Sequence, residues 1–210
     1  DFGKTGMKIK RVGFGGIPIQ RISQEDTNKV IDELEKCGVN FIDTARGYTV
    51  SEEYLGNALK GRREKFYIAT KSMSRDYESM KRDIEISLKN LQTDYIDLYQ
   101  MHNVKPAEYD TLFGEDKAYR ALLEAKEQGK IKHIGITSHG LETVEKAVES
   151  DKFETIQFPY NIVENQADEV FKRAYEKGVG TIVMKPLAGG AIDDGTLAMK
   201  YLLSREYIDV

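Results

Sequence analysis

The sequence of 210 residues contains a single cysteine, Cys37. One cysteine excludes an internal disulfide and a cysteine-based metal cluster, and it is compatible with a reducing cytoplasm. No apolar run approaches about 18 residues, which excludes a membrane-spanning helix. The 31 basic and 35 acidic residues give a net charge of -4 and are scattered along the chain. They form neither a basic stripe for nucleic acid nor a polybasic membrane patch, and no signal peptide is recognisable. We therefore expect a cytoplasmic protein.

What the sequence does contain is a repeated pattern in which a charged amphipathic stretch ends at a glycine and a short apolar run follows. The pattern occurs at 33-ELEKCGVNFIDT-44, 124-EAKEQGKIKHIGIT-137 and 173-RAYEKGVGTIVMK-185. Glycine is the usual left-handed residue at the end of a helix, and the apolar runs are typical of parallel strands buried on both faces. The pattern therefore predicts helices that end at Gly38, Gly129 and Gly178, each followed by a buried strand.

The spacing of the predicted strands indicates the fold class. Strands are expected to begin near residues 10, 39, 66, 95, 132, 155, 180 and 207, and helices at 24–37, 52–60, 77–91, 115–128, 141–149, 166–177 and 195–204. The mean spacing of about 28 residues is that of one βα unit. Ser23 and Asn165 are predicted helix N-caps, with Asp26 and Asp168 as their capping-box partners.

These units predict an α/β protein with a (β/α)8 TIM-barrel fold, as one domain over residues 1–210. Because the last predicted strand only begins near residue 207, we expect the barrel to lack its last strand, loop and helix within this sequence. A doubly wound sheet is the alternative. Its phosphate-binding fingerprint should follow the first strand, but the candidate 13-GFGGIP-18 has Pro18 where the third glycine is needed.

Polar residues at the predicted C-terminal strand ends indicate an active site, because barrel enzymes place their chemistry there. Asp43, Lys71 and His102 end the second, third and fourth strands, and Tyr48 follows in the loop after Asp43. We expect Asp43 to pair with Lys71, and the Lys71 ammonium to lower the pKa of Tyr48. Tyr48 could then protonate a substrate oxygen that His102 orients. Because no side chain donates hydride, this chemistry implies a nicotinamide cofactor.

The sequence resembles the aldo-keto reductase family. The matching segments are 11-RVGFGG-16, 41-FIDTARGYTVSEEYLG-56, 67-YIATK-71, 95-YIDLYQMHN-103, 134-IGITSHG-140 and 156-IQFPYN-161. The resemblance implies a (β/α)8 barrel, a catalytic tetrad of Asp43, Tyr48, Lys71 and His102, and NADPH-dependent reduction of aldehydes or ketones to alcohols or the reverse.

The resemblance also implies where the cofactor binds. Ser138 and Gln157 match the family's ligands of the nicotinamide carboxamide, whereas His139 stands where Asn is common and Met184 where a stacking Tyr is common. Lys185 and 187-LAGG-190, which includes Leu187, Gly189 and Gly190, fit a pyrophosphate-binding loop. No metal site is expected. NADP(H) is the expected cofactor, with NAD(H) left open, and the expected partner is a small carbonyl or alcohol substrate.

Two alternatives to a carbonyl reductase stay open from the sequence. Lys71 could be the nucleophile of a Schiff-base aldolase. The protein could also be a cofactor-binding regulatory subunit with slow turnover. Some relatives continue into an iron–sulfur segment, and the sequence does not indicate whether such a module follows residue 210. A metal-dependent hydrolase is disfavoured, because only His102 and His139 lie near the predicted mouth of the barrel. The sequence indicates neither the physiological substrate nor an oligomeric state.

Overall fold

The computed structural model describes residues 2–210, and the chain divides into two compact units. The first unit consists of Val12–His102 and Glu108–Ile134, and we call it the 12–134 unit. The second consists of the residues up to Arg11, Asn103–Ala107 and Gly135–Val210, and we call it the 135–210 unit. Within residues 2–210, no helix is long and apolar enough to cross a membrane.

The 12–134 unit alternates strands and helices. Its strands are β1 (Phe14–Gly15), β2 (Phe41–Asp43), β3 (Tyr67–Ser72), β4 (Ile96–Met101) and the first residues of β5 (Ile131–Thr137). Its α-helices are α1 (Gln24–Cys37), α2 (Ser51–Ala58), α3 (Tyr77–Leu91) and α4 (Ala118–Glu127), with short 3-10 helices η1 (Ile17–Arg21) and η2 (Arg63–Lys65). The helix η3 (Pro106–Leu112) begins in the other unit.

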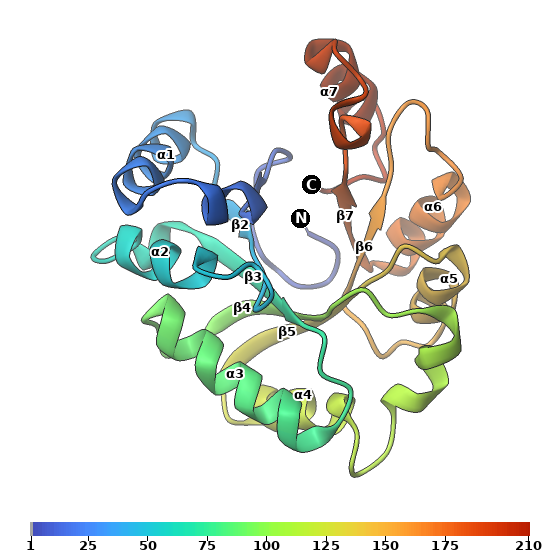
Figure 1. The fold of residues 1–210 in the computed structure, drawn as a ribbon. Coiled ribbons are helices and arrows are strands. Elements are labelled where there is room, and N and C mark those ends of the chain that lie inside the picture. Colours follow the sequence, from blue (N-terminus) through green and yellow to red (C-terminus); the bar gives the residue numbers. More distant parts are fainter. Residues whose placement is uncertain (1) are drawn as a thin grey trace. The chain divides into compact units, whose positions relative to one another are not determined.

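The strands of this unit pair in parallel and in chain order, with β5 beside β4. Each of the helices α1 to α4 packs against the next on the outer side of the strands (Figure 1). All of β4 and nearly all of β3 are buried, as predicted for strands covered on both faces. Sequential order differs from a doubly wound sheet, in which the strand order reverses.

The register of these strands positions the polar residues predicted from the sequence. Asp43 is level with Ala69, and Lys71 is level with Gln100. Because side chains alternate along a strand, Lys71 and Ala69 point to the same face of the sheet. Asp43 and Lys71, separated by 28 positions in the chain, therefore come close together at the C-terminal ends of β2 and β3.

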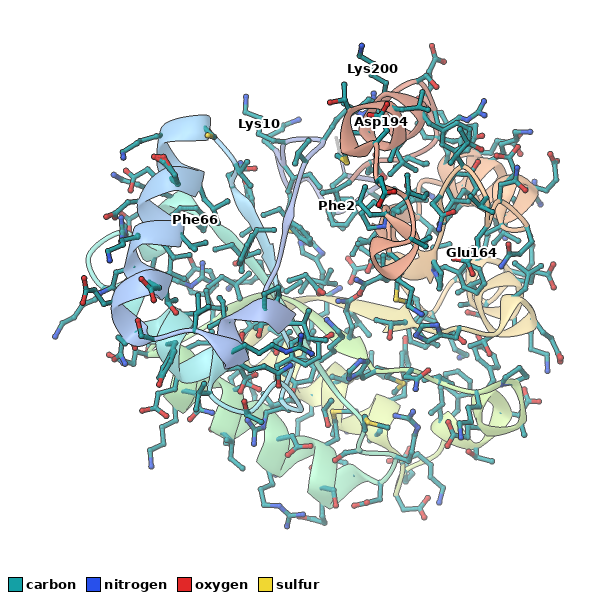
Figure 2. All side chains as sticks on the ribbon, turned by 45° about the horizontal axis from the view of Figure 1, so that its top comes forward. Phe2, Lys10, Phe66, Glu164, Asp194 and Lys200 are labelled. Atoms are coloured by element: carbon teal, nitrogen blue, oxygen red, sulfur yellow. The ribbon has the colours of Figure 1, made fainter. Side chains whose placement is uncertain are left out.

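The 135–210 unit contains the end of β5, β6 (Thr155–Pro159), β7 (Gly180–Met184), α5 (Leu141–Glu149), α6 (Asp168–Lys177), η4 (Ala188–Gly190) and α7 (Gly195–Leu203). β6 pairs in parallel with β5 and β7, and α5 and α6 pack beside them. The N-terminal segment belongs to this unit. Phe2 is labelled in Figure 2, and a Cβ added at Gly180 would come within 2.6 Å of its ring.

The predicted helix ends are largely confirmed. Gly38, Gly129 and Gly178 have φ values of 72°, 74° and 72°, as expected for left-handed residues that end helices. Ser23 caps α1 by accepting a hydrogen bond from the Asp26 amide. The predicted cap at Asn165 is wrong, because α6 begins at Asp168 and its N-cap residue is Ala167.

The strand predicted to begin near residue 207 is not formed as a strand. Glu206 and Tyr207 lie in a turn, and Val210 alone makes ladder-type hydrogen bonds with β7, through the Thr181 carbonyl and the Val183 amide. The preceding residues are held by side chains instead. The hydroxyl of Thr181 donates to the Tyr207 carbonyl, and Arg11 donates to the Ile208 carbonyl.

Helices α2 and α3 approach closely at Gly56. A Cβ at this position would lie 2.2 Å from the Asn90 carbonyl oxygen and 2.9 Å from the carbonyl carbon of Leu91. Because these are backbone atoms, the Gly56→Ala substitution would force the helices apart, and it should lower the free energy of unfolding by about 1–3 kcal/mol. Urea denaturation measures the effect, with Glu53→Ala at an exposed position of α2 as the control. Equal stability of Gly56→Ala and the wild type would contradict the close approach.

Candidate active site

A buried ion pair connects β2 and β3. Lys71 Nζ donates hydrogen bonds to Asp43 Oδ2 at 2.5 Å and to the Thr44 carbonyl at 2.8 Å. The side chains of Lys71 and Asp43 are 3% and 13% exposed. The predicted pairing of these two residues is therefore confirmed. Burying two charges is costly unless they are paired and hydrogen-bonded, and both conditions hold here.

Tyr48 lies over this ion pair. Lys71 Nζ is 5.1 Å from the centre of the Tyr48 ring, within the range of a cation–π contact. Among residues 2–210, none makes a side-chain hydrogen bond to the Tyr48 hydroxyl. The phenol is thus held by its ring and its loop, and its O–H group can donate to a bound molecule.

The pKa of Tyr48 differs from the sequence prediction. Burial, together with the negative charge of Asp43, raises the pKa of Tyr48 to about 12. The prediction of a lowered pKa for Tyr48 is therefore wrong. The physical reason is that burial and the Asp43 carboxylate both disfavour the phenolate. Tyr48 consequently carries its proton throughout the physiological pH range.

The raised pKa of Tyr48 has a measurable consequence at alkaline pH. Between its ordinary value of 10.0 and about 12, the unfolded chain loses this proton while the folded protein keeps it. Because the folded state then binds more protons, the free energy of unfolding should fall as the pH rises through this window. Denaturation curves of wild type and Tyr48→Phe measure the effect, and the decline should be shallower in the variant. Parallel pH dependence of the two proteins would contradict the assignment.

His102 lies directly after β4, next to Tyr48. The two rings meet edge to face, with centroids 6.1 Å apart and an interplanar angle of 86°. The backbone of His102 is fixed on both sides, because its amide donates to the Ser72 carbonyl at 2.9 Å and its carbonyl accepts from Arg75 Nη2 at 2.8 Å. The four predicted catalytic residues therefore lie together in the 12–134 unit.

Gln100 also belongs to this cluster, although it is not among the site residues predicted from the sequence. Its side chain is fully buried, and Nε2 donates to Asp43 Oδ1 at 3.0 Å. Both carboxylate oxygens of Asp43 are thus engaged, one by Lys71 and one by Gln100. The signal in the sequence is the spacing, since Gln100 lies two residues before His102 and alternation places both side chains on the same face of β4.

The residues predicted to bind the cofactor lie in the 135–210 unit. Ser138 follows β5 and is fully buried, with its hydroxyl donating to the Val104 carbonyl at 2.5 Å and accepting from the Gly140 amide at 2.9 Å. Gln157, in β6, is 5% exposed. Met184 is half-buried at the end of β7, where its carbonyl accepts from the Tyr160 amide at 3.1 Å.

The loop after β7 has a backbone that suits a phosphate group. Gly189 and Gly190 have φ values of 70° and 99°, and a Cβ added at either would meet nothing within 4 Å. Lys185 and Leu187 are exposed beside them. An open, glycine-rich backbone next to a cation is a chemically suitable donor set for a pyrophosphate, so these residues fit the predicted cofactor.

Asn161 shapes the neighbouring loop after β6. Its buried side chain donates to the Lys185 carbonyl at 3.1 Å and accepts from the amides of Val163 and Glu164 at 2.9 and 2.8 Å. Glu164, which belongs to this loop, is labelled in Figure 2.

Partial burial and the charge of Lys185 lower the pKa of His139.

Comparison with known proteins shows the family. The model of the aldo/keto reductase family matches residues 11–206, so the chain belongs to the aldo/keto reductase family. The aldo-keto reductase AKR11C1 from Bacillus halodurans, in its holo form, has a similar structure, with a TM-score of 0.87 and 25% sequence identity. That similarity covers 100% of this chain and 83% of the other. The predicted (β/α)8-barrel fold class is confirmed.

Two relatives illustrate the similarity in sequence. The chain is 29% identical over 212 residues to L-galactose dehydrogenase of Arabidopsis thaliana, covering 91% of this chain and 66% of that protein. It is 30% identical over 213 residues to aldo-keto reductase YhdN of Bacillus subtilis strain 168, covering 90% of this chain and 61% of that protein. The chain thus spans less than two thirds of the length of either relative.

Proposed function

We propose that the protein is an NAD(P)H-dependent oxidoreductase that reduces an aldehyde or ketone to an alcohol, or catalyses the reverse reaction. The observation that carries the proposal is the Lys71–Asp43 ion pair beneath the ring of Tyr48, with His102 beside it. The Tyr48 hydroxyl keeps its proton near neutral pH, and no side chain among residues 2–210 makes a hydrogen bond to it. Such a group is suited to protonate a carbonyl oxygen.

Each side chain of the cluster has a role in this reaction. Tyr48 is the general acid, and His102 orients the carbonyl oxygen toward it. Lys71 supplies the positive charge that stabilises the phenolate formed when the proton leaves. Asp43 and Gln100 hold the ammonium in place through the hydrogen bonds described above. A bound nicotinamide cofactor supplies the hydride that none of these side chains can donate.

We propose that the 135–210 unit binds the cofactor. Ser138, His139, Gln157 and Met184 would hold the nicotinamide, whereas Lys185 and the glycines of 187-LAGG-190 would hold the pyrophosphate. The open backbone at Gly189 and Gly190 supports the second assignment. NADPH is the proposed cofactor, with NADH as the alternative. We also propose that the substrate is a small carbonyl or alcohol compound. We further propose a cytoplasmic location, which cell fractionation would test.

The geometry does not favour the alternative in which Lys71 forms a Schiff base. A lysine nucleophile must be uncharged, but Lys71 donates to a carboxylate and to a backbone carbonyl, both of which stabilise the ammonium. A regulatory subunit with slow turnover would share the same fold. Steady-state turnover distinguishes it from an enzyme.

The test of the proposed function is binding and turnover in the same preparation. Fluorescence titrations with NADPH and with NADH should show binding of at least one, and a panel of aldehydes and ketones should show multiple turnovers. Cofactor binding without turnover would favour the regulatory subunit. Absence of binding by either cofactor would refute the proposal.

Lys185 provides a specific prediction about the cofactor. If its ammonium contacts the pyrophosphate, Lys185→Met should raise the cofactor Kd by about 10- to 150-fold, because a hydrogen bond to a charged group contributes about 1.5–3 kcal/mol. Titration at low ionic strength measures the loss, with Lys200→Met at an exposed position of α7 as the matched control (Figure 2). An unchanged Kd in Lys185→Met would remove Lys185 from the proposed pyrophosphate site.

A further inference from the structure

A buried carboxylate stands behind the active site, on the helix side of β3. Glu52, in the first turn of α2, is 1% exposed. Its Oε1 accepts from the hydroxyls of Thr70 and Ser87, both at 2.7 Å. Its Oε2 accepts from Arg46 Nη1 at 2.8 Å and from Asn90 Nδ2 at 3.2 Å. Because a buried charge is costly, four donors converging on one carboxylate indicate a fixed element of the structure.

A second carboxylate lies on the other side of the same guanidinium group. Asp83, in α3, has Oδ1 at 3.8 Å from Arg46 Nε, and its Oδ2 accepts from the hydroxyls of Ser72 at 2.5 Å and Ser74 at 2.7 Å. Arg46 thus lies between Glu52 and Asp83. We call Arg46, Glu52 and Asp83 the positioning cluster.

The positioning cluster is connected to Lys71 through its two neighbours in β3. Thr70 binds Glu52 and Ser72 binds Asp83, and alternation along the strand directs both hydroxyls away from the face that carries the Lys71 ammonium. The Arg46 amide also donates to the Lys71 carbonyl at 2.9 Å. Arg46 lies two residues before Tyr48, so the same residue fixes β3 and the loop that carries the phenol.

We propose that the positioning cluster holds the Tyr48 loop against β3 and thereby sets the placement of Tyr48 over Lys71. The inference rests on the proposed function only in taking Tyr48 as the proton donor. Arg46, Glu52 and Asp83 are positioning residues, since they act through Tyr48 and Lys71 rather than on a substrate. A guanidinium group suits this task because it is rigid, planar and always charged, so Arg46 can hydrogen-bond Glu52 through Nη1 while it stays within ion-pair distance of Asp83.

Another ion pair in the same unit provides a matched control. Arg63 Nη2 lies 2.7 Å from Asp97 Oδ2, and the two side chains are 14% and 11% exposed. Arg63 also donates to the carbonyls of Phe66 and Tyr95, which precede β3 and β4. The pair therefore sits at the N-terminal ends of the strands, away from Lys71 and His102. Arg63→Met should destabilise the protein without affecting the Tyr48 loop.

The kinetic test compares three substitutions. Arg46→Met should lower kcat by about 100-fold, since small misplacements of reacting groups have effects of that size, while the Kd for NADPH stays within about twofold. Arg46→Lys keeps the positive charge but not the planar guanidinium group, so its kcat should lie between those of Arg46→Met and the wild type. Arg63→Met should retain the wild-type kcat. Equal kcat values for Arg46→Met and Arg63→Met would overturn the proposal.

A second readout does not depend on catalysis. In wild type, the amides of Arg46, Tyr48 and Ser51 donate to the carbonyls of Lys71, Ala45 and Tyr48. In Arg46→Met these three amides should exchange with solvent at least tenfold faster, whereas the amides of β4 keep their protection. Glu52→Gln replaces the carboxylate beside Arg46 by an uncharged amide. It should show the same pattern, and it provides the test if Arg46→Met does not fold.

The two readouts separate this proposal from the proposed function. If the wild-type protein reduces no carbonyl compound, the proposed function fails and hydrogen exchange alone decides the role of the positioning cluster. Unchanged protection of the three loop amides in both Arg46→Met and Glu52→Gln would overturn the proposal, whatever the catalytic result.

Discussion

Removing the hydroxyl of Tyr48 by the Tyr48→Phe substitution is expected to lower kcat by about 10²–10⁴-fold, which is the usual contribution of general acid catalysis. The ring remains, so the cation–π contact with Lys71 and the edge-to-face contact with His102 should survive. Among residues 2–210, no side-chain hydrogen bond to the Tyr48 hydroxyl is lost with it. The folded structure and the cofactor Kd should therefore be unchanged, and the loss should appear in the chemical step.

Single-turnover kinetics and cofactor titration of Tyr48→Phe measure the two quantities separately. Tyr175→Phe is a suitable control, because Tyr175 is 55% exposed on α6. A Tyr48→Phe variant that reduces its best aldehyde at the wild-type rate would show that another group donates the proton. His102 would then be the first candidate.

The Lys71→Met substitution is expected to have the second large effect, on both activity and stability. Methionine fills a similar volume but leaves the Asp43 carboxylate without its cation. Breaking a buried ion pair by removing one partner typically lowers the free energy of unfolding by about 3–5 kcal/mol. With Lys71 gone, the charge of Asp43 would also raise the pKa of Tyr48 further, so proton transfer should slow.

Urea denaturation and kcat together test the Lys71→Met prediction. Because Lys71 acts through the proton of Tyr48, the double variant Lys71→Met/Tyr48→Phe should be about as slow as the slower single variant. Fully additive effects of the two substitutions on the activation free energy would show that Lys71 and Tyr48 act independently. Lys200→Met, at an exposed position, should leave stability and kcat unchanged.

Elements with a strong local signal were predictable from the sequence. The predicted bounds of helices 24–37, 77–91 and 141–149 agree with α1, α3 and α5. The Ser23 cap was predictable because it depends on residues three positions apart. The true start of α6 was not predictable in this way. The loop before α6 is organised by the buried side chain of Asn161, which accepts hydrogen bonds from the amides of Val163 and Glu164.

The candidate site was predictable where it depends on strand ends, and not where it depends on tertiary packing. Asp43 and Lys71 end neighbouring strands, so their pairing followed from the order of the strands. The pKa of Tyr48 depends on the depth of burial, which the sequence does not indicate. Likewise, Glu52 and Glu53 are adjacent and chemically identical, but only Glu52 is turned inward against α3. The catalytic and cofactor-binding roles of these residues remain predictions.

The alternation of side chains along β3 has a consequence for how this strand reaches its place during folding. Lys71 contacts Asp43 on one face, while Thr70 and Ser72 contact the positioning cluster on the other. A strand paired one residue out of register would turn the ammonium toward the helices and both hydroxyls toward Asp43. All three polar contacts would be lost together. The groups that perform chemistry in the finished protein thus also disfavour misaligned pairings of the strand that carries them.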